Sequence, residues 1–375
     1  MKVMMIAGEV SGDIHGSYVV KKLKEFSNDI EIFGVGGDEM QNAGMEIVEH
    51  IKEISFMGFF EVAKNLSKIF ALEKKLIENV KLRKPNLVLL IDYPGFNLRF
   101  ASKIKQLGIK IFYYVGPQIW AWKKNRILKI KKYIDKVFLV FPFEVDLYKK
   151  HNINAEFVGH PLTEEIFIQK SKEEFLEENN LNNSKKIIGF FPGSRKQEIQ
   201  NIFPIMLKTA NQLNKKLDVQ CVVGVASSFD LSFIQEFIPK KIEIKLLQNQ
   251  THHLMKHCNV AVVTSGTATL ETAFLETPMI VVYKTLLVNF LLAKLFVKIK
   301  HISLVNIVAK KEIVLEFIQR RANVENLFSA VKKLIENNKL YNDTKSNLVL
   351  LKNQFESFSA STKVAEAIYS YLKTC

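Results

Sequence analysis

The chain of 375 residues contains few cysteines: only Cys221, Cys258 and Cys375, which stand far apart and form no CxxC pair. Neither a disulfide framework nor a zinc site is therefore indicated, and a reducing cytoplasm is the default compartment. No secretion is expected, because the apolar run of residues 1–6 is too short to form the core of a signal peptide.

Long apolar runs are absent as well. The most apolar region, residues 286–297, is broken by Asn289 and Lys294, whereas a membrane-spanning helix needs about 20 consecutive apolar residues. The sequence therefore predicts a protein that is either soluble or bound to a membrane surface.

Acidic residues are fewer than basic ones, 38 Asp and Glu against 53 Lys and Arg, and the formal net charge is +15. Such an excess points to polyanionic partners, which include nucleic acid, anionic lipid and phosphorylated substrates. The basic residues are dispersed, however, and no known nucleic-acid-binding motif with interleaved aromatic residues is present. No nucleic-acid partner is therefore expected, and a basic nucleic-acid-binding protein remains an alternative on charge alone.

What is present is the composition of a folded protein, with 48% hydrophobic and 24% charged residues in a chain long enough for two domains. Short apolar runs alternate with longer helical patterns, and this alternation builds a parallel sheet covered by helices on both faces. The strand-like runs form two series: 3–7, 30–35, 87–91, 109–115, 136–140 and 155–158, then 187–191, 219–225, 242–247, 260–264 and 279–283. We predict an α/β protein with two doubly wound, Rossmann-like domains.

The boundary between these domains is expected near residues 159–161, because a glycine and a proline end regular structure there. This gives an N-terminal domain of residues 1–162, a C-terminal domain of residues 163–345 and a terminal segment of residues 346–375. The segment shows one long helical pattern over residues 347–372, which would either close the second domain or cross back onto the first domain or a partner subunit.

The first candidate functional loop, GEVSGDIHG, begins at Gly8 directly after the first predicted strand. Ligands of such sheets bind beyond the carboxyl ends of the strands. The glycines allow close approach of the backbone, while Glu9, Ser11, Asp13 and His15 supply polar side chains. A simpler interpretation is a glycine turn in which Ser11 or Asp13 caps the following helix.

Asp92 stands at the end of the strand-like run 87–91, where a proline and a glycine then turn the chain away. A carboxylate partly removed from water is basic enough to accept the proton of a sugar hydroxyl that attacks an anomeric carbon. Asp92 is therefore the leading candidate for a general base, and Glu9 and Asp13 are the other candidate catalytic carboxylates. The alternative is that Asp92 only caps the next helix.

Two glycine turns in the second half of the chain predict the binding of a nucleotide diphosphate. Each joins a strand to a helix, where backbone N–H groups and the positive helix end attract an anion. Arg195 adds a guanidinium to the first turn, and Glu271 lies about one helical turn beyond the second, within reach of a ribose. The residues expected to bind the nucleotide are Gly193, Ser194, Arg195, Ser265, Gly266, Thr267 and Glu271.

Neither turn is a Walker loop or a GxGxxG fingerprint. No acidic cluster of the metal-binding type stands beside them, so that Arg195 and the helix ends would have to stabilise the departing diphosphate. These features favour a glycosyltransferase that needs neither a metal nor another cofactor.

Several stretches of the sequence carry a specific resemblance to a known family. They are GEVSGDIHG (8–16), MGFFEV (57–62), IDYPGFN (91–97), YYVGPQIWAWKKNR (113–126), FVGHPL (157–162), FPGSR (191–195) followed by Glu198, and TSGTATLE (264–271). In these motifs, and over nearly its whole length, the sequence resembles the lipid A disaccharide synthase family. The resemblance implies the GT-B architecture, in which two Rossmann-like domains face each other across a cleft.

The resemblance also implies a reaction. An inverting enzyme of this kind transfers the sugar of UDP-2,3-diacylglucosamine to 2,3-diacylglucosamine 1-phosphate (lipid X), forming the lipid A disaccharide 1-phosphate and UDP. It would work at the cytoplasmic face of the inner membrane of a Gram-negative bacterium. The family's functional residues fall on Asp92 as the base and on Arg195, Glu271 and Asn306 as UDP-binding residues. Two positions depart from the pattern: Gly95 replaces a frequent aspartate, and Val305 replaces a frequent proline.

Because both substrates are amphiphiles, contact with the membrane surface is expected. One apolar helical stripe flanked by lysines suits such contact, and it comprises Phe59, Val62, Ala63, Leu66, Ile69 and Phe70. The alternative is that this stripe belongs to the core of its domain. A second candidate is the basic stretch 123–136, preceded by Trp120 and Trp122, for which a solvated basic face is the alternative.

Other interpretations of the function remain open. The closest are a GT-B glycosyltransferase that acts on another lipid carrier and a UDP-sugar epimerase of the same architecture, because phosphate loops do not identify the sugar. Whether two copies form a homodimer is left open. His252, His253 and His257 are interpreted as structural histidines.

Overall fold

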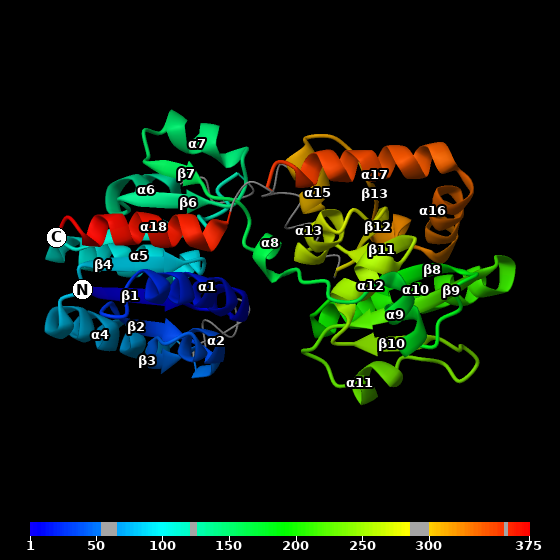
Figure 1. Ribbon diagram of the computed structural model, residues 1–375, viewed down its shortest axis with the longest axis horizontal. Coiled ribbons are helices and arrows are strands. Elements are labelled where there is room, and N and C mark those ends of the chain that lie inside the picture. The colour runs from blue at the N-terminus through cyan, green and yellow to red at the C-terminus, as the bar shows by residue number, and fades with distance from the viewer. Residues whose placement is uncertain (54–65, 121–125, 286–299, 356–358) are drawn as a thin grey trace. The chain divides into compact units, whose positions relative to one another are not determined.

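The computed structural model describes every residue of the chain except 54–65, 121–125, 286–299 and 356–358. The chain divides into two compact units (Figure 1): unit 1 consists of Met1–Pro161 and Ser357–Cys375, and unit 2 of Leu162–Glu356. The apolar region 286–297 and Trp122 lie outside the described residues.

In unit 1, the described residues form a seven-stranded parallel sheet with the order β3-β2-β1-β4-β5-β6-β7. The strands are β1 (Lys2–Ala7), β2 (Glu31–Gly36), β3 (Glu46–His50), β4 (Leu87–Ile91), β5 (Lys110–Tyr114), β6 (Lys136–Leu139) and β7 (Ala155–Phe157). The helices are α1 (Val10–Phe26), α2 (Asp38–Asn42), α4 (Leu66–Arg83), α5 (Pro94–Ile104), α6 (Arg126–Tyr133), α7 (Glu144–Lys150) and α18 (Ala360–Leu372), with 3-10 turns at Ile51–Glu53 and Lys105–Leu107. Strand β4 is buried along its whole length, as expected for a sheet covered on both faces.

In unit 2, the described residues form a six-stranded parallel sheet with the order β10-β9-β8-β11-β12-β13. The strands are β8 (Lys186–Phe191), β9 (Val219–Val225), β10 (Lys245–Gln248), β11 (Val260–Thr264), β12 (Met279–Tyr283) and β13 (Leu315–Ile318). The helices are α8 (Leu162–Glu165), α9 (Lys172–Glu178), α10 (Lys196–Lys216), α11 (Leu231–Gln235), α12 (Thr251–His257), α13 (Thr267–Phe274), α15 (Leu304–Ala309), α16 (Val324–Glu336) and α17 (Asn338–Lys352), with a 3-10 turn at Gln319–Arg321.

The prediction of two doubly wound α/β domains is confirmed, and each predicted strand is present near its expected position. The prediction misses β3 and β13, which lie at sheet edges. Strand β3 reads EIVEH and is mostly half-exposed, and β13 has only four residues. Edge strands are short and partly polar because one side faces solvent, and their sequences therefore lack a clear apolar run.

The prediction of a single C-terminal helix over residues 347–372 is wrong. Helix α17 ends at Lys352, and the amides of Gln354 and Phe355 bond to carbonyls three residues back instead of four. This tighter turn lets the buried Phe355 ring pack 5.2 Å from the ring of Phe274 in unit 2. Helix α18 belongs to unit 1, where it packs against α1. The domain boundary drawn at residue 346 therefore falls inside α17.

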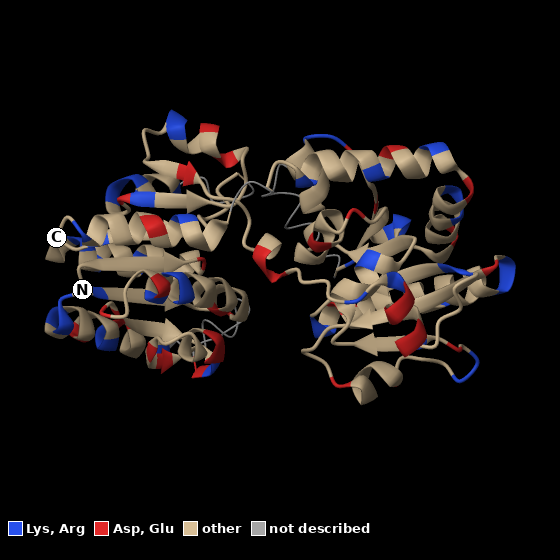
Figure 2. Cartoon of the chain, viewed as in Figure 1, with Lys and Arg blue, Asp and Glu red and all other residues tan. Residues whose placement is uncertain are grey.

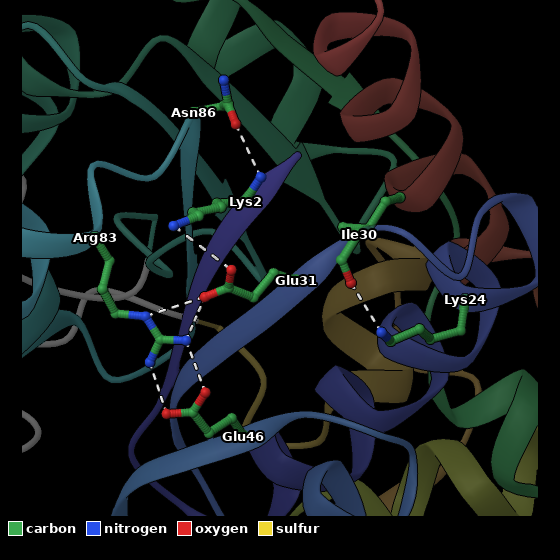
Figure 3. Close-up of polar contacts among 7 residues, drawn as sticks. All are labelled: Lys2, Lys24, Ile30, Glu31, Glu46, Arg83 and Asn86. Atoms are coloured by element: carbon green, nitrogen blue, oxygen red, sulfur yellow. Dashed lines mark hydrogen bonds and ion pairs between the residues drawn. The ribbon is translucent and has the colours of Figure 1, made fainter.

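Figure 3 shows a polar network that joins the first strands of unit 1. The guanidinium of Arg83, at the end of α4, binds Glu31 of β2 and Glu46 of β3, with Nη1–Oε1 of Glu46 at 2.6 Å. The same group stacks 3.8 Å from the centroid of the Phe33 ring, and the backbone N–H of Lys2 donates to Asn86 Oδ1 at 2.8 Å. These contacts attach α4 to the N-terminal ends of the strands, opposite the loops that follow β1 and β4.

Lys and Arg residues, in blue, and Asp and Glu residues, in red, occur in both units (Figure 2). Helix α6 contains four basic residues and no acidic one. None of the described helices is long and apolar enough to cross a membrane.

Candidate functional site

In unit 1, two of the predicted functional loops lie side by side at the point where the strand order reverses. Strand β1 pairs with β4, and Ala7 lies opposite Ile91 in the register. Gly8 and Asp92 are therefore the first residues beyond two neighbouring strands. Doubly wound sheets bind ligands at this reversal point, and the fold brings the first loop and the candidate base together there.

The backbone at Asp92 is held in a rare conformation. Asp92 and Tyr93 have φ angles of 44° and 48°, the left-handed region, which costs about 1 kcal/mol or more for each residue that is not glycine. The amide of Asp92 donates to the Tyr114 carbonyl at 3.0 Å. Its own carbonyl accepts hydrogen bonds from Asn97 Nδ2, at 2.8 Å, and from the Tyr113 hydroxyl.

Burial raises the pKa of the Asp92 carboxyl to about 6, and the negative charge of Glu9 adds to this effect. The Tyr93 amide and the charges of His15 and Arg126 act in the opposite direction. A carboxylate with this pKa is ionised at neutral pH and more basic than an exposed aspartate. The structure does not support the alternative of a simple cap, because Tyr93 occupies the N-cap position of α5 and no side-chain cap bond is present there.

Gly8 allows a ring to cover the first loop. A Cβ atom on Gly8 would lie 2.3 Å from atoms of the Tyr93 ring, so that only glycine fits beneath it. Glu9 is the N-cap residue of α1, yet its side chain makes no capping hydrogen bond. Ser11 is exposed at the start of the same helix. The Glu9 carboxylate is close enough to Asp92 for its charge to raise the Asp92 pKa.

The side chain of Asp13 caps a neighbouring helix, and its role as a catalytic carboxylate stays a prediction. Its buried side chain accepts hydrogen bonds from three backbone amides: Gly37 at 2.6 Å, Glu39 at 3.1 Å and Met40 at 3.1 Å. These amides form the N-terminus of α2, and Asp13 caps that helix from a neighbouring one.

His15 is buried in the same loop, close enough to Asp92 for its charge to influence the Asp92 carboxyl. His160 is buried beside the Phe141 ring, with a centroid distance of 5.2 Å. Burial, together with the charge of His15, lowers the pKa of His160 to about 3, so that its imidazole is neutral at working pH. Sequence reasoning did not assign His160 or Arg126 to the site. The motifs FVGHPL and YYVGPQIWAWKKNR contain them, but neither motif shows that the charge of Arg126 acts on Asp92 or that His160 lies near His15.

In unit 2, the strand order reverses between β8 and β11, where Phe191 lies opposite Val263. The two predicted phosphate turns follow these strands and therefore lie next to each other. The first contains Gly193, with φ 108°, and leads into Arg195, the N-cap residue of α10.

Two backbone amides of this turn are already bound within the protein, which argues against their prediction as groups that receive the diphosphate. Glu198 Oε2 accepts hydrogen bonds from the amides of Ser194 and Arg195, at 3.1 and 3.2 Å. Its other oxygen lies 3.2 Å from Arg195 Nη1. The Arg195 side chain is nevertheless 69% exposed, so that its guanidinium is still accessible to a phosphate.

The second turn is more open. Gly266 and Thr267, at the start of α13, are exposed, and nothing lies within 4 Å of a Cβ built on Gly266. The Ser265 hydroxyl donates to the Ile302 carbonyl at 3.2 Å. One helical turn further on, Glu271 Oε2 lies 3.0 Å from His252 Nε2. His252 is interpreted as a structural histidine from the sequence. In the structure it contacts Glu271, the candidate ribose-binding residue.

Asn306 has a structural task as well, which corrects its prediction as a UDP-binding residue. Its side chain is completely buried. Its Nδ2 donates to Val314 O and Glu316 Oε1, both at 2.8 Å, and its Oδ1 accepts from the amides of Ile313 and Val314, at 2.8 and 3.1 Å. All four hydrogen-bonding positions of the amide are therefore used to fix the start of β13.

The predicted membrane stripe is only partly described. Phe59 and Val62 lie outside the described residues, and Leu66 is the first residue of α4. Ile69 packs in the hydrophobic core of unit 1, so that its assignment to the membrane is wrong. Phe70 is 54% exposed, with the Arg99 guanidinium 4.9 Å from its ring centroid.

Trp120 is half-buried, and its indole Nε1 donates to Glu144 Oε1 at 3.0 Å. Its ring packs edge-on against Phe143, with a centroid distance of 5.3 Å. The indole is thus fixed within unit 1. Among the described residues, no group of three or more His, Cys, Asp or Glu side chains could hold a metal ion.

Comparison with known proteins identifies the family. Residues 3–368 match the family described as lipid-A-disaccharide synthetase. The chain is 35% identical over 371 residues to a lipid-A-disaccharide synthase from Coxiella burnetii, which covers 99% of this chain and 98% of the relative. The chain belongs to the lipid A disaccharide synthase family. Members of this family are glycosyltransferases, and the predicted transferase activity and family membership are confirmed.

Other relatives of the family are similar over most of their length. The synthase of Syntrophus aciditrophicus is 36% identical over 336 residues, 89% of this chain and 88% of the relative. That of Geobacter metallireducens is 33% identical over 373 residues, 99% and 97% of the two chains.

Solved structures with low sequence identity share the fold. A UDP-GlcNAc 2-epimerase from Neisseria meningitidis, bound to UDP-GlcNAc, has a TM-score of 0.66 at 15% identity and covers 99% of this chain and 100% of its own. A calicheamicin glycosyltransferase has a TM-score of 0.65 at 12% identity, with 99% and 98% covered. These likenesses confirm the GT-B fold of two α/β domains.

Proposed function

We propose that the chain condenses UDP-2,3-diacylglucosamine with 2,3-diacylglucosamine 1-phosphate, with inversion at the transferred sugar, and that Asp92 is the general base. The observation that carries the proposal is the Asp92 carboxyl, which stands at the reversal point of the unit 1 sheet with its pKa raised to about 6. A pKa near the working pH suits a group that must accept a proton during the reaction.

In this mechanism, the 6-hydroxyl of the acceptor attacks the anomeric carbon of the donor. The hydroxyl proton passes to the Asp92 carboxylate as the new carbon–oxygen bond forms. The bond between the anomeric carbon and the diphosphate oxygen breaks, and UDP leaves with the bonding electrons. Attack from the side opposite the leaving group inverts the configuration.

Unit 2 would hold UDP through the two turns at its reversal point. The exposed Gly266 and Thr267 admit phosphate oxygens to the N-terminus of α13. The guanidinium of Arg195 stabilises the negative charge on the departing diphosphate. Glu271, oriented by its contact with His252, accepts hydrogen bonds from the ribose hydroxyls. Gly193 and Ser194 act through the backbone that places Arg195.

In unit 1, the first loop would lie beside the acceptor. Glu9 raises the basicity of Asp92, as its contribution to the Asp92 pKa indicates. His15 and Ser11, from the same loop, would contact the acceptor. Gly8 leaves room for the Tyr93 ring, which covers the loop.

The decisive experiment measures UDP release from both substrates in mixed micelles, with EDTA present. Wild type is compared with Asp92→Asn, Arg195→Ala and the control Asp29→Asn, which alters an exposed aspartate of the same unit. We expect turnover that EDTA does not affect, full activity in the control, and near-complete loss in Asp92→Asn with the fold intact. Turnover of soluble UDP-GlcNAc without the acceptor would instead favour an epimerase, and an active Asp92→Asn enzyme would remove Asp92 as the base.

The protein would act on the inner face of the bacterial inner membrane, where these amphiphilic substrates reside. Exposed apolar side chains support this: Phe70, and Leu128, which is 64% exposed on the basic helix α6. We expect Phe70→Ser with Leu128→Ser to weaken flotation with anionic vesicles, whereas Leu82→Ser, at the other end of α4, should not. Equal flotation of all variants would exclude these two residues from the contact.

A further inference from the structure

The position of Asp92 requires two consecutive residues in the left-handed region, Asp92 and Tyr93. Neither is glycine. Such a backbone persists only when its surroundings hold it. The contacts of the Asp92 main chain therefore show which residues maintain it.

Three hydrogen bonds hold the Asp92 peptide groups. The amide is bound to Tyr114 O on the neighbouring strand β5. The carbonyl accepts from two side chains, Tyr113 Oη and Asn97 Nδ2. Asn97 Nδ2 also donates to the Ile91 carbonyl, at 3.2 Å. The two side chains thus converge on one main-chain oxygen from different elements, β5 and α5.

Both side chains are completely buried. Burial raises the pKa of the Tyr113 hydroxyl well above its usual value, so that it remains protonated and can donate a hydrogen bond. Because both side chains are buried, their hydrogen bonds to the Asp92 carbonyl lie inside the protein and away from solvent. Neither residue is placed to react with a sugar.

We propose that Tyr113 and Asn97 are positioning residues, which hold the Asp92 carbonyl and thereby aim the Asp92 carboxylate at the acceptor hydroxyl. This inference rests on the proposed function of Asp92 as the base. Catalysis of this kind is sensitive to placement, because a displacement of about 1 Å can cost a hundredfold in rate.

Tyr113→Phe tests the proposal with the smallest change. It removes the hydroxyl and keeps the ring. Without that bond the Asp92 peptide can relax, and the carboxylate moves into a more hydrated position. We expect kcat to fall about tenfold or more, with KM unchanged, and the acid limb of the pH–rate profile to shift to lower pH. A merely structural role would lower thermal stability and leave the acid limb in place.

Tyr148→Phe is the matched control. Tyr148 is also completely buried, and its hydroxyl donates to a main-chain oxygen, that of Pro117, at 3.1 Å. The substitution therefore removes the same kind of bond from a carbonyl that does not belong to Asp92. We expect a similar loss of stability with wild-type kcat and an unshifted acid limb.

Asn97→Ser adds an independent test, since both side chains bind one oxygen. If they share a single task, the loss of kcat in the double variant Tyr113→Phe/Asn97→Ser should be smaller than the product of the two single losses. Independent, multiplicative losses would overturn the shared role.

The outcomes separate the two proposals. If Asp92→Asn stays active, the proposed base is wrong. If Asp92→Asn is inactive, but Tyr113→Phe has wild-type kcat and an unshifted acid limb, the base stands and the positioning role of Tyr113 and Asn97 is overturned.

Discussion

The Glu198 carboxylate lies against the main chain of Gly193: a Cβ atom on Gly193 would come within 2.3 Å of Glu198 Oε2. Gly193 also has a φ of 108°, a conformation that residues with side chains rarely adopt. Glycine is thus needed at this position for two reasons. It lets an internal carboxylate occupy the start of α10, and this carboxylate in turn contacts the side chain of Arg195.

We therefore expect Gly193→Ala to lower the free energy of unfolding by about 1–3 kcal/mol, measured by urea denaturation. It should also raise the KM for the UDP-sugar, because Arg195 moves with the loop. Gly95→Ala is the control, since nothing lies within 4 Å of a Cβ there, and its stability should stay the same or rise by up to about 1 kcal/mol, because alanine favours a helix such as α5 more than glycine does. Equal stability of the two variants would show that the Gly193 loop tolerates a side chain.

The pH dependence of kcat/KM should report the Asp92 carboxyl. Because the base must be ionised, activity should fall tenfold for each pH unit below about 6, the value to which burial and Glu9 raise the Asp92 pKa. Glu9→Gln should move this limb to lower pH. It should not reach the limb of an exposed aspartate, since burial is the larger cause. An acid limb near pH 4 in the wild type would contradict the assignment.

Asp92 should cost the protein stability at neutral pH. Its pKa in the folded state is about 6, against an ordinary value of 3.8, so that the folded state binds the proton more tightly than the unfolded state. The contribution of Asp92 to the free energy of unfolding therefore falls as pH rises from about 4 to 6 and is constant above that. Asp92→Asn removes this cost, and we expect it to be more stable than wild type by up to about 3 kcal/mol at pH 8 but not at pH 3.5. Chemical denaturation at the two pH values measures the difference, and a gain of the same size at both would point to another cause.

His252 should matter for donor binding through Glu271. We expect His252→Ala to raise the KM for the UDP-sugar about fivefold to tenfold with little change in kcat, because one hydrogen bond that orients Glu271 is lost. His253→Ala is the control. His253 lies on the same helix, and its Nε2 accepts from the Gln169 amide at 3.3 Å, away from Glu271. A KM that rises equally in both variants would indicate a general effect on α12.

Much of the fold followed from local patterns. The buried strands were readable because each is a short, continuous apolar run between helical patterns, as for β4 and β9. The edge strands β3 and β13 were not, since their half-exposed positions carry polar residues. The break between α17 and α18 also escaped detection, because it depends on the contact of Phe355 with Phe274, and helical periodicity does not contain that contact.

Some features of the candidate site could likewise be predicted from the sequence, and others could not. The motifs identified Asp92, Arg195 and the second glycine turn, because their chemistry is visible in the residue types and in their position after strands. The motifs could not separate Asp13 from Asp92, since both are carboxylates in loops of one site. Their surroundings differ. Asp13 accepts hydrogen bonds from three backbone amides, whereas the Asp92 carboxyl is buried near the negative charge of Glu9.

The sequence by itself determined the two-domain α/β class, the family and the loops that carry the chemistry, because periodicity and short motifs are local properties of the chain. Only the tertiary structure decided which polar side chains already make hydrogen bonds within the protein. Asn306 and Asp13 bind backbone amides inside the protein, Glu198 fills the start of α10, and Tyr113 reaches the Asp92 carbonyl from the next strand. The physical reason is that these hydrogen bonds depend on distances between segments remote in the sequence, which a residue pattern does not encode.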